Sequence, residues 1–364
     1  MVLNLYNRIK KYKITFKKNR HVDILMLDLN YSGLKFENYS VKVLDLSEIN
    51  LYYFIPQLLI SLITNFEFRN FKYYYLKRLF SSFNANVSIG HHISGHSFTY
   101  KYCMPDSIAI TYQFCWFCDI DFKNYYNIHR SKENSCDYFI VYDKFHARNF
   151  SKIIRSKYLI GGSVKNNELI LEDVPKIYDI MYISEYRGAS SDDFYEFSIR
   201  TLGEYCKNSN KTLCIAFSSL RPDKVGKISY GAELSYYRNL TNFIVVNDKN
   251  STELATISKM CVAVSSNLAI ELLSRSIKVF YMLVSGPSIT KFNPYFLKNY
   301  EGVFWYRGTD KEAIMRKLDI LFNMSTSEWK IFLKQNKIQI LFDPGNTILK
   351  QLVDDIINEK QKKL

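Results

Sequence analysis

The sequence predicts an α/β protein built from two doubly wound, Rossmann-like domains that face a cleft. Its 364 residues are too many for one ordinary core and suit two domains. Strand-like and helix-like segments alternate along the chain, which favours parallel sheets. The alternation is interrupted at Lys165–Lys176, a polar stretch with Pro175 that predicts a linker. We expect a first domain over 1–165, a second over 177–345, and a last helix over 346–364 that packs back toward the first domain.

In the first half, short apolar runs predict strands and longer amphipathic runs predict helices. The predicted strands are Asp23–Leu29, Val41–Leu46, Val87–Ile89, Ser107–Tyr112, Tyr138–Tyr142 and Lys157–Ile160. The predicted helices are 51–66, 70–83 and Lys144–Ile154. The last strand leads into two glycines and Ser163, where the backbone can approach a ligand closely and the serine offers a hydroxyl. An ordinary turn explains this triplet equally well.

The second half repeats the alternation. The predicted strands are Asp179–Ser184, Thr212–Phe217, Phe243–Val246, Cys261–Val264, Lys278–Met282 and Gly302–Tyr306. The predicted helices are 192–207, 231–239, 251–259, Asn267–Ser274, 310–323, 326–336 and 346–360. Ligands of doubly wound sheets bind beyond the carboxyl ends of the strands, so polar residues at those ends are the first candidates for a site.

The composition indicates a folded, basic protein. Hydrophobic residues make up 47% of the chain, enough for full cores, and the formal net charge is +14. A basic surface favours anionic partners, although AT-rich coding DNA also accounts for part of the lysine content. Residues 1–20 carry basic side chains and no acid, which suits either a solvated end or contact with an anionic membrane. Leu51–Ile63 is the most apolar stretch but is too short to cross a bilayer, so we interpret it as a buried or interfacial helix.

The cysteines predict a reduced, cytoplasmic protein, because they are odd in number, scattered, and not preceded by a signal-peptide pattern. Cys115 and Cys118 form a Cys-x-x-Cys, but no second pair stands at zinc spacing. We therefore expect no metal and no cofactor. Aromatic and basic residues interleave in Phe71–Phe80 and Tyr100–Phe122, as on some nucleic-acid surfaces. No recognition motif accompanies them, and we expect no nucleic-acid partner.

The segment Cys261–Tyr281 is the most informative part of the chain. A buried strand runs into Ser265 and Ser266 and then into a helix. The free N–H groups at a helix N-terminus, with the positive end of its dipole, suit a phosphate, so both serines are candidate nucleotide contacts. Glu271 lies about one turn into the helix, where its carboxylate can accept both hydroxyls of a ribose. An i,i+4 ion pair with Arg275 explains the same spacing equally well.

Three further polar residues follow predicted strands of the second half. Ser184 and Arg187 follow one strand, and Arg221 follows the next through two serines. An arginine that faces a diphosphate makes charge-assisted hydrogen bonds, although a surface ion pair is the commoner role of a lone arginine. Together with Ser163, these residues complete the candidate nucleotide contacts.

Three histidines, His91, His92 and His96, lie together after the strand Val87–Ile89. No acid or cysteine completes a metal site with them. Imidazole titrates near neutrality, which suits a general base, so His96 and His91 are the catalytic candidates. A polar loop without a catalytic role is the alternative.

Several segments, taken in order, resemble elements of surface carbohydrate biosynthesis transferases. The strand with Ser265-Ser266, four residues, Glu271 and a following Lys278-Val279 resembles the strand–Ser–Ser/Thr–helix–Glu element of that group, with Arg275-Ser276 in place of Arg-Gly. Related elements occur in capsule sugar transferases, CDP-glycerol glycerophosphotransferases and UDP-N-acetylglucosamine 2-epimerases. The remaining matches are Ile110–Cys115, Cys136–Tyr142, Tyr158–Asn167, Tyr178–Arg187 and Leu341–Leu349. In the first of these, Phe114 and Cys115 stand where the group has His and Gly.

The resemblance implies a GT-B-like fold in which the second domain binds a nucleotide sugar and the first binds the acceptor. It places phosphates near Ser265 and Ser266 and the ribose near Glu271. The implied activity is a glycosyltransferase that moves a sugar from a nucleotide-sugar donor to a cell-surface polysaccharide, such as capsule, or to a glycolipid, at the inner face of the cell membrane. The alternatives are a sugar-nucleotide epimerase and a basic binding protein without catalysis.

Overall fold

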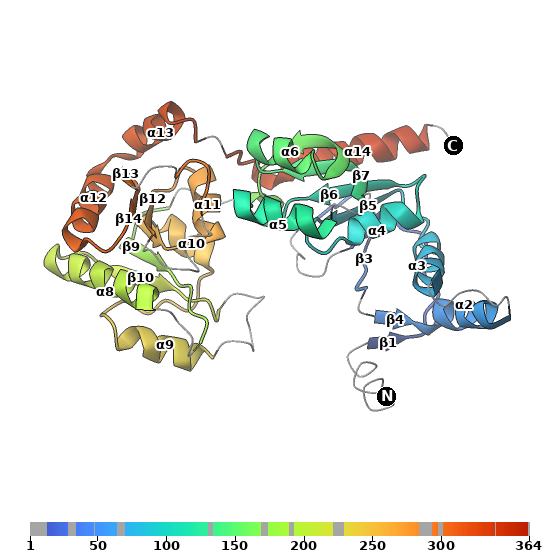
Figure 1. The fold of residues 1–364 in the computed structure, drawn as a ribbon, viewed down its shortest axis with the longest axis horizontal. Coiled ribbons are helices and arrows are strands. Elements are labelled where there is room, and N and C mark those ends of the chain that lie inside the picture. Colours follow the sequence, from blue (N-terminus) through green and yellow to red (C-terminus); the bar gives the residue numbers. More distant parts are fainter. Residues whose placement is uncertain are drawn as a thin grey trace. The chain divides into compact units, whose positions relative to one another are not determined.

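The computed structural model describes residues 13–27, 34–46, 48–63, 70–129, 134–168, 174–188, 193–220, 229–283, 293–297, 301–338 and 340–362. The chain divides into two compact units, each with its own sheet (Figure 1). The first unit comprises Met1–Phe114, Tyr125–Leu169 and Asp343–Leu364, and the second comprises Cys115–Asn124 and Ile170–Phe342.

The first unit contains a six-stranded, wholly parallel sheet. Its strands are, in spatial order, β3 (Val41–Val43), β2 (Ile24–Met26), β5 (Val87–His91), β6 (Ile108–Tyr112), β7 (Asn134–Val141) and β8 (Ile154–Ile160). The chain starts at β2, adds β3 on one side and then builds outward from β5 on the other. The strand order therefore reverses between β2 and β5, which is where doubly wound sheets bind ligands.

Helices and a small second sheet complete the first unit. The helices are α2 (Leu51–Ile63), α3 (Phe71–Ser81), α4 (His96–Cys103), α5 (Asp119–His129), which crosses the unit boundary, α6 (Lys144–Phe150), α7 (Val164–Asn167) and α14 (Thr347–Gln361). Strands β1 (Lys13–Thr15) and β4 (Glu48–Asn50) pair in parallel beside α2. Apolar residues of α14, including Leu349 and Val353, pack with Ile24, Val87 and Ile110 in one core.

The second unit repeats the doubly wound arrangement. Its strands are, in spatial order, β10 (Leu213–Ala216), β9 (Tyr178–Ile183), β11 (Ser258–Ala263), β12 (Val279–Leu283), β14 (Trp305–Arg307) and β13 (Glu301–Gly302), and only the β13–β14 pair is antiparallel. Its helices are α8 (Asp193–Asn208), α9 (Tyr230–Arg238), α10 (Ser251–Thr256), α11 (Asn267–Ser274), α12 (Lys311–Asn323) and α13 (Thr326–Gln335). The strand order reverses between β9 and β11. The parallel sheets with flanking helices confirm the predicted α/β class.

Several elements differ from the sequence expectation. Helices α4 and α5 were not expected, because their aromatic and β-branched residues mask helical periodicity. The segment Phe243–Val246 makes one isolated bridge, between Ile244 and Cys214, rather than a strand. The polar stretch expected to be a linker begins with α7, whose N-terminus is capped by Ser163.

The C-terminal segment is fixed to the first unit by buried amides. Asn346 donates from Nδ2 to the carbonyl of Val164 (2.9 Å), and Asn167 donates from Nδ2 to Oδ1 of Asn346 (3.0 Å). Asp343 accepts from the backbone N–H of Ile348 at 2.9 Å. Asn346 also adopts a left-handed backbone conformation with φ of 56°, which asparagine tolerates better than most residues. The backbone of Asn346 thus turns the chain into α14, and its side chain anchors that turn to the first unit.

We predict that Asn346→Ala lowers the unfolding free energy of the first unit by about 2–4 kcal/mol, because it removes buried hydrogen bonds and forces alanine into the left-handed region. Asn346→Gly should lose the same bonds without the backbone strain, and should be less destabilised by about 1 kcal/mol. Urea unfolding followed by far-UV circular dichroism measures both. Equal midpoints for the two variants would contradict the strain contribution.

Candidate functional site

At the strand reversal of the second unit, a carboxylate accepts hydrogen bonds from the residue just before the N-cap of α11. Glu185 follows β9, and its Oε1 and Oε2 accept hydrogen bonds from the backbone N–H and the hydroxyl of Ser265, both at 2.5 Å. Burial raises the pKa of Glu185, while the bonds from Ser265 and the nearby charge of Arg187 oppose the rise. The end of β9 and the start of the β11–α11 connection are therefore joined through one carboxyl group.

A second carboxylate joins the neighbouring strand ends. Glu233, fully buried on α9, accepts from the backbone N–H groups of Ser218 (2.8 Å) and Ser219 (2.7 Å), which follow β10. The hydroxyl of Ser184 also donates to Glu233, and it accepts from the hydroxyl of Tyr237 at 2.8 Å. Glu233 thus fixes the ends of β9 and β10 with respect to each other.

Helix α11 begins at this edge of the sheet. Ser266 is its N-cap residue and is only 9% exposed, but its side chain does not cap the helix. The first N–H groups of a helix have no partner within the helix, so a side chain, water or ligand must satisfy them. An anion suits this position because the helix dipole adds to the N–H groups.

Glu271 lies one turn further along α11 and is only 8% exposed, so it does not sit on a wet surface. Burial lowers the pKa of Arg275 to about 10, and the charge of Glu271 opposes that shift. The guanidinium of Arg275 also lies 4.1 Å from the ring centre of Phe342. The charge of Glu271 therefore acts on Arg275 within the second unit, and the two interpretations of Glu271 both remain predictions.

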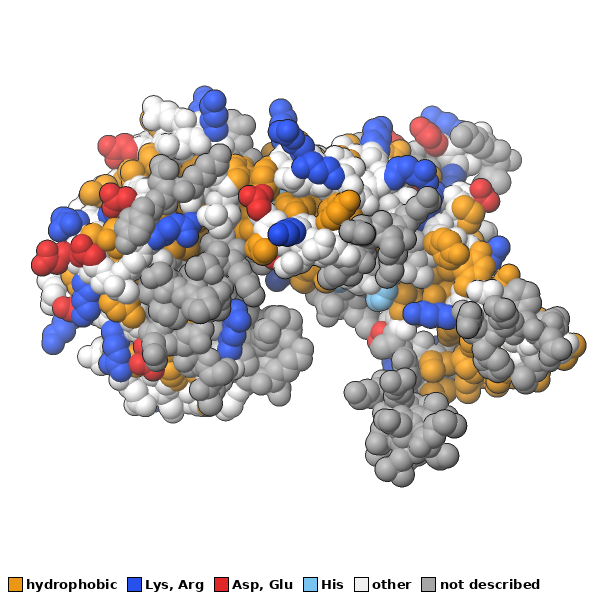
Figure 2. Space-filling view, in the orientation of Figure 1, with side chains coloured by type: hydrophobic (Ala, Val, Ile, Leu, Met, Phe, Trp, Pro, Cys, Tyr) orange, Lys and Arg blue, Asp and Glu red, His pale blue; other side chains and the backbone are white. Residues whose placement is uncertain are grey.

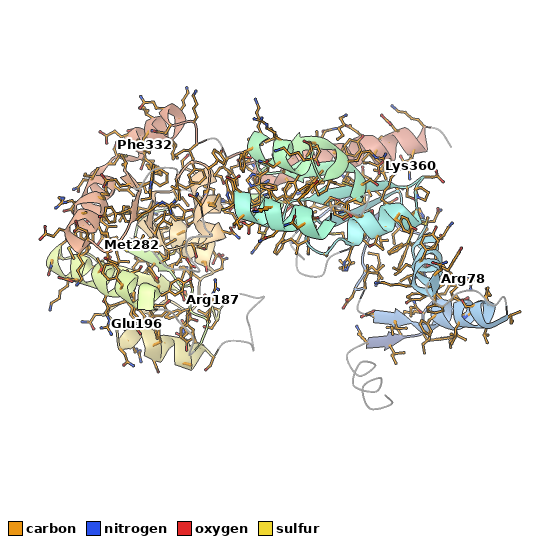
Figure 3. All side chains as sticks on the ribbon, viewed as in Figure 1. Arg78, Arg187, Glu196, Met282, Phe332 and Lys360 are labelled. Atoms are coloured by element: carbon orange, nitrogen blue, oxygen red, sulfur yellow. The ribbon has the colours of Figure 1, made fainter. Side chains whose placement is uncertain are left out.

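The remaining predicted nucleotide contacts are dispersed. Ser184 is buried, and its hydroxyl is already engaged by Glu233 and Tyr237. Arg187, labelled in Figure 3, is exposed. Its charge lowers the pKa of Glu185. Ser163 belongs to the first unit, where its hydroxyl accepts from the N–H of Asn166 at 3.3 Å. Arg221 lies outside the described residues.

In the first unit, His96 lies at the strand reversal between β2 and β5. It begins α4, and its Nδ1 is 3.2 Å from the carbonyl oxygen of Leu27, just beyond β2. A carbonyl only accepts, so Nδ1 carries the proton and the lone pair of neutral His96 is on Nε2. This close approach needs Gly90, since a Cβ there would lie 2.6 Å from Oγ of Ser97. Neutral His96 is thus in the tautomer that a general base at Nε2 requires.

His91 has the opposite tautomer. Its Nδ1 accepts from the backbone N–H of Ser94 at 3.0 Å, so neutral His91 carries its proton on Nε2. Its ring is buried 4.8 Å from that of Phe114. His92 is also buried, and its Nδ1 accepts from the N–H of Phe114 at 3.2 Å. Of the two catalytic candidates, His96 has the more suitable geometry for a base.

The Cys-x-x-Cys pair is not arranged for thiol chemistry. Burial raises the pKa of both Cys115 and Cys118 to about 12, and the charges of Asp121 and Glu271 add to the shift at Cys115. The sulfur of Cys118 accepts from the N–H of Asn293 at 3.3 Å. Over the described part of the chain, no group of histidine, cysteine or acidic side chains could hold a metal ion.

Sequence reasoning missed Glu185 and Glu233. Glu185 directly follows a predicted buried strand, a position that marks a polar residue as a candidate for a site. Glu233 lies on α9, and the periodicity of a helix does not indicate which distant loop one of its side chains contacts. The sequence around Glu233 therefore does not predict its bonds to Ser218 and Ser219.

Comparison with known proteins identifies the family. Residues 119–357, about two thirds of the chain, match the model of a family described as "putative O-antigen biosynthesis protein". The chain belongs to this family. No curated protein sequence matches the chain significantly.

Solved structures with the same fold are GT-B-like enzymes of surface carbohydrate metabolism. A UDP-N-acetylglucosamine 2-epimerase from Neisseria meningitidis, solved with UDP-GlcNAc, is 11% identical and covers 95% of this chain and 100% of its own, with a TM-score of 0.53. A wall teichoic acid polymerase, TagF, is 13% identical and covers 95% and 91%, also with a TM-score of 0.53. An epimerase-like protein from Listeria monocytogenes is 10% identical and covers 96% and 98%, with a TM-score of 0.55. The expected GT-B-like fold with two Rossmann-like domains is confirmed.

We predict that Glu185 makes the stability of the second unit depend on pH. Its pKa is raised in the folded protein, so the folded chain keeps this proton at pH values where the unfolded chain has lost it. The stabilisation is complete below the ordinary pKa of glutamate and is lost as pH rises through the folded pKa. Denaturant titrations across that interval should show a flatter profile for Glu185→Gln than for the native protein. The exposed Glu312→Gln should retain the native profile, and an identical slope in all three proteins would refute the assignment.

Proposed function

We propose that the protein is a glycosyltransferase that moves a sugar from a nucleotide-sugar donor to a surface polysaccharide or glycolipid acceptor. The second unit binds the donor, and the first unit binds the acceptor and supplies the base. Membership of a family concerned with O-antigen biosynthesis supports this class of product.

The observation that carries the proposal is the N-terminus of α11 at the strand reversal of the second sheet. Its first N–H groups are not capped by Ser266, so they are suited to the donor phosphates. Ser265 stands beside them, and Glu271 follows within the same helix, where a carboxylate accepts the two ribose hydroxyls. Helix N–H groups and dipole offset the charge of the departing nucleotide, and Arg187 and Arg221 can add to this, so the chemistry does not need a metal.

His96 is the proposed general base. Its Nε2 accepts the proton of the acceptor hydroxyl as that oxygen attacks the anomeric carbon and the bond to the nucleotide breaks. The carbonyl of Leu27 holds the ring and stabilises the imidazolium that forms. Contact with the anionic inner face of a membrane would bring a lipid-linked acceptor within reach.

A sugar-nucleotide epimerase is the second candidate, and Glu185 favours it. This group is a carboxyl with a raised pKa at the strand reversal, as acid–base chemistry on a bound sugar requires. Product analysis separates the two functions, because an epimerase converts the donor alone and a transferase needs an acceptor. Binding without either reaction would indicate a non-catalytic protein.

A thermal-shift screen of UDP-, CDP-, GDP- and CMP-sugars tests the donor class. A cognate donor at about 100 times its Kd should add about 2.7 kcal/mol of stability. Failure of every nucleotide sugar to shift the melting temperature would remove the proposal.

We predict that Glu271→Gln weakens binding of the cognate donor by about 1–3 kcal/mol, the scale of lost hydrogen bonds to a charged group. The near-isosteric amide should leave the fold intact. Isothermal titration calorimetry measures the loss, with Glu312→Gln, at an exposed position of α12, as the matched control. Native affinity in the Glu271 variant would remove this residue from the site.

We predict that His96→Asn lowers kcat by about 10²–10⁴-fold, since general-base catalysis contributes on that scale. Donor affinity should remain native, because His96 belongs to the unit assigned to the acceptor. His91→Asn is the comparison, and its kcat should fall less. A larger loss of kcat in His91→Asn than in His96→Asn would identify His91, not His96, as the general base.

A further inference from the structure

Helix α2 exposes an unusually apolar surface. Its 13 residues contain no charged side chain, and Ile55, Leu59 and Ile63 are 42%, 53% and 83% exposed. Phe16, beside β1, extends this surface by packing edge-to-face on Tyr52 at 5.7 Å. Figure 2 shows hydrophobic side chains gathered over α2 and α3. Exposed apolar surface of this extent marks a contact with a protein or a membrane.

Basic side chains border the apolar surface. The cations of the adjoining segments are Lys13, Lys17, Lys18, Arg20, Lys72, Lys77 and Arg78. Lys13 is paired with Glu48, but for Lys77 and Arg78 no carboxylate lies within salt-bridge distance in the part of the chain that the structure describes. α3 carries no acidic residue at all. The ammonium of Lys77 lies 5.9 Å from the ring centre of Tyr73, a contact that does not neutralise its charge, so both cations can still attract an external anion.

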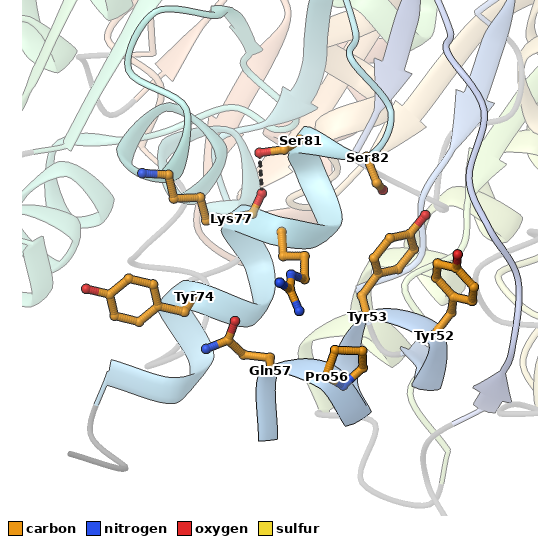
Figure 4. Close-up of a pocket in the computed structure, with 9 residues that line it drawn as sticks. Tyr52, Tyr53, Pro56, Gln57, Tyr74, Lys77, Ser81 and Ser82 are labelled. Atoms are coloured by element: carbon orange, nitrogen blue, oxygen red, sulfur yellow. Dashed lines mark hydrogen bonds between the residues drawn. The ribbon is translucent and has the colours of Figure 1, made fainter. Parts of the chain in front are cut away.

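An open groove of about 600 Å³ lies between α2 and α3 (Figure 4). Tyr52, Tyr53, Pro56 and Tyr74 form its mainly apolar wall, with Lys77 and Arg78 at its polar side. Internal hydrogen bonds already occupy several of its hydroxyls: Tyr53 accepts from the N–H of Asn19 at 2.8 Å, and Ser82 donates to a carbonyl of α3. The cations are thus the groups that the groove offers to a ligand.

We propose that the face formed by α2 and α3 docks onto an anionic lipid bilayer, with the phosphate of a lipid headgroup bound in the groove by Lys77 and Arg78. The proposal rests on the membrane contact suggested above and gives it a surface and a ligand. No helix among the described residues is long and apolar enough to cross a membrane. In the proposed arrangement α2 lies in the membrane interface, with its apolar side chains in the acyl layer.

The charge pattern favours lipid over a protein partner. Lysine is depleted in the centre of protein interfaces, whereas an interfacial helix is flanked by lysine and arginine that meet headgroup phosphates. The apolar wall also favours a lipid phosphate over a free anion, because a free phosphate gains nothing from tyrosine and proline surfaces.

Vesicle co-sedimentation tests the surface and the groove separately. Ile60, like Leu59, is exposed on α2. Leu59→Ser with Ile60→Ser should weaken binding to phosphatidylcholine–phosphatidylglycerol vesicles on the order of 100-fold, since two side chains no longer enter the acyl layer. Lys77→Gln with Arg78→Gln should weaken it about 30-fold, at about 1 kcal/mol per basic residue, and should weaken binding to pure phosphatidylcholine much less, because the choline cation of that lipid already offsets the charge of its phosphate. The salt dependence of vesicle binding should fall in the Lys77→Gln, Arg78→Gln variant but not in the Leu59→Ser, Ile60→Ser variant.

Matched variants in the second unit control for general loss of apolar or basic surface. These are Ile320→Ser with Ile331→Ser, both exposed, and Lys330→Gln with Lys334→Gln on α13. Native binding by both controls supports the proposal, provided that all variants keep the native melting temperature. An equal loss of vesicle binding in the control pairs would overturn the proposal. Release of the native protein from vesicles by inorganic phosphate at constant ionic strength would also overturn it. The affinity of the same variants for the nucleotide-sugar donor can be measured without membranes. A failed membrane proposal can therefore be told apart from a failed glycosyltransferase proposal.

Discussion

Buried backbone N–H groups at the ends of parallel strands need acceptors, and two carboxylates satisfy this need in the second unit. Glu233 takes the N–H groups that follow β10, and Glu185 takes the one that precedes α11. Each bond removes the cost of leaving a buried donor without a partner. The loops at the strand reversal are held in place as a result, and so is the start of α11, whose N-terminus the side chain of Ser266 does not cap.

In the first unit, hydrogen bonds between imidazole rings and the backbone position the histidines. The carbonyl of Leu27 binds His96, while Ser94 bonds to His91 and Phe114 to His92. These bonds fix which nitrogen of each imidazole carries the proton. Three histidines that are equivalent in the sequence thereby become different in chemistry, and only His96 combines partial exposure with a lone pair on Nε2.

The candidate site could be predicted in part. Ser265, Ser266 and Glu271 stand at a strand-to-helix junction, which local pattern reveals, and their placement at the strand reversal follows from the topology. Ser184 and Ser163 also follow strands, yet the hydroxyl of each is used internally, by Glu233 and by the N-terminus of α7. Position at a strand end is readable from sequence, but the hydrogen-bond partner of a side chain there is not, because that partner comes from a distant segment.

The sequence by itself determined the α/β class and most of the buried parallel strands, because such strands are continuous apolar runs whatever surrounds them. It wrongly predicted a strand at Phe243–Val246, and it merged β13 and β14 into one strand over Gly302–Tyr306. It also determined α2 as an apolar helix too short to span a bilayer. Tertiary structure decided how exposed the apolar side chains of α2 are, which tautomer each histidine adopts, and which hydrogen bonds hold Asn346 in the first unit. It decided the roles of Glu185 and Glu233 too. These features depend on contacts between segments many residues apart, and periodicity carries no information about such contacts.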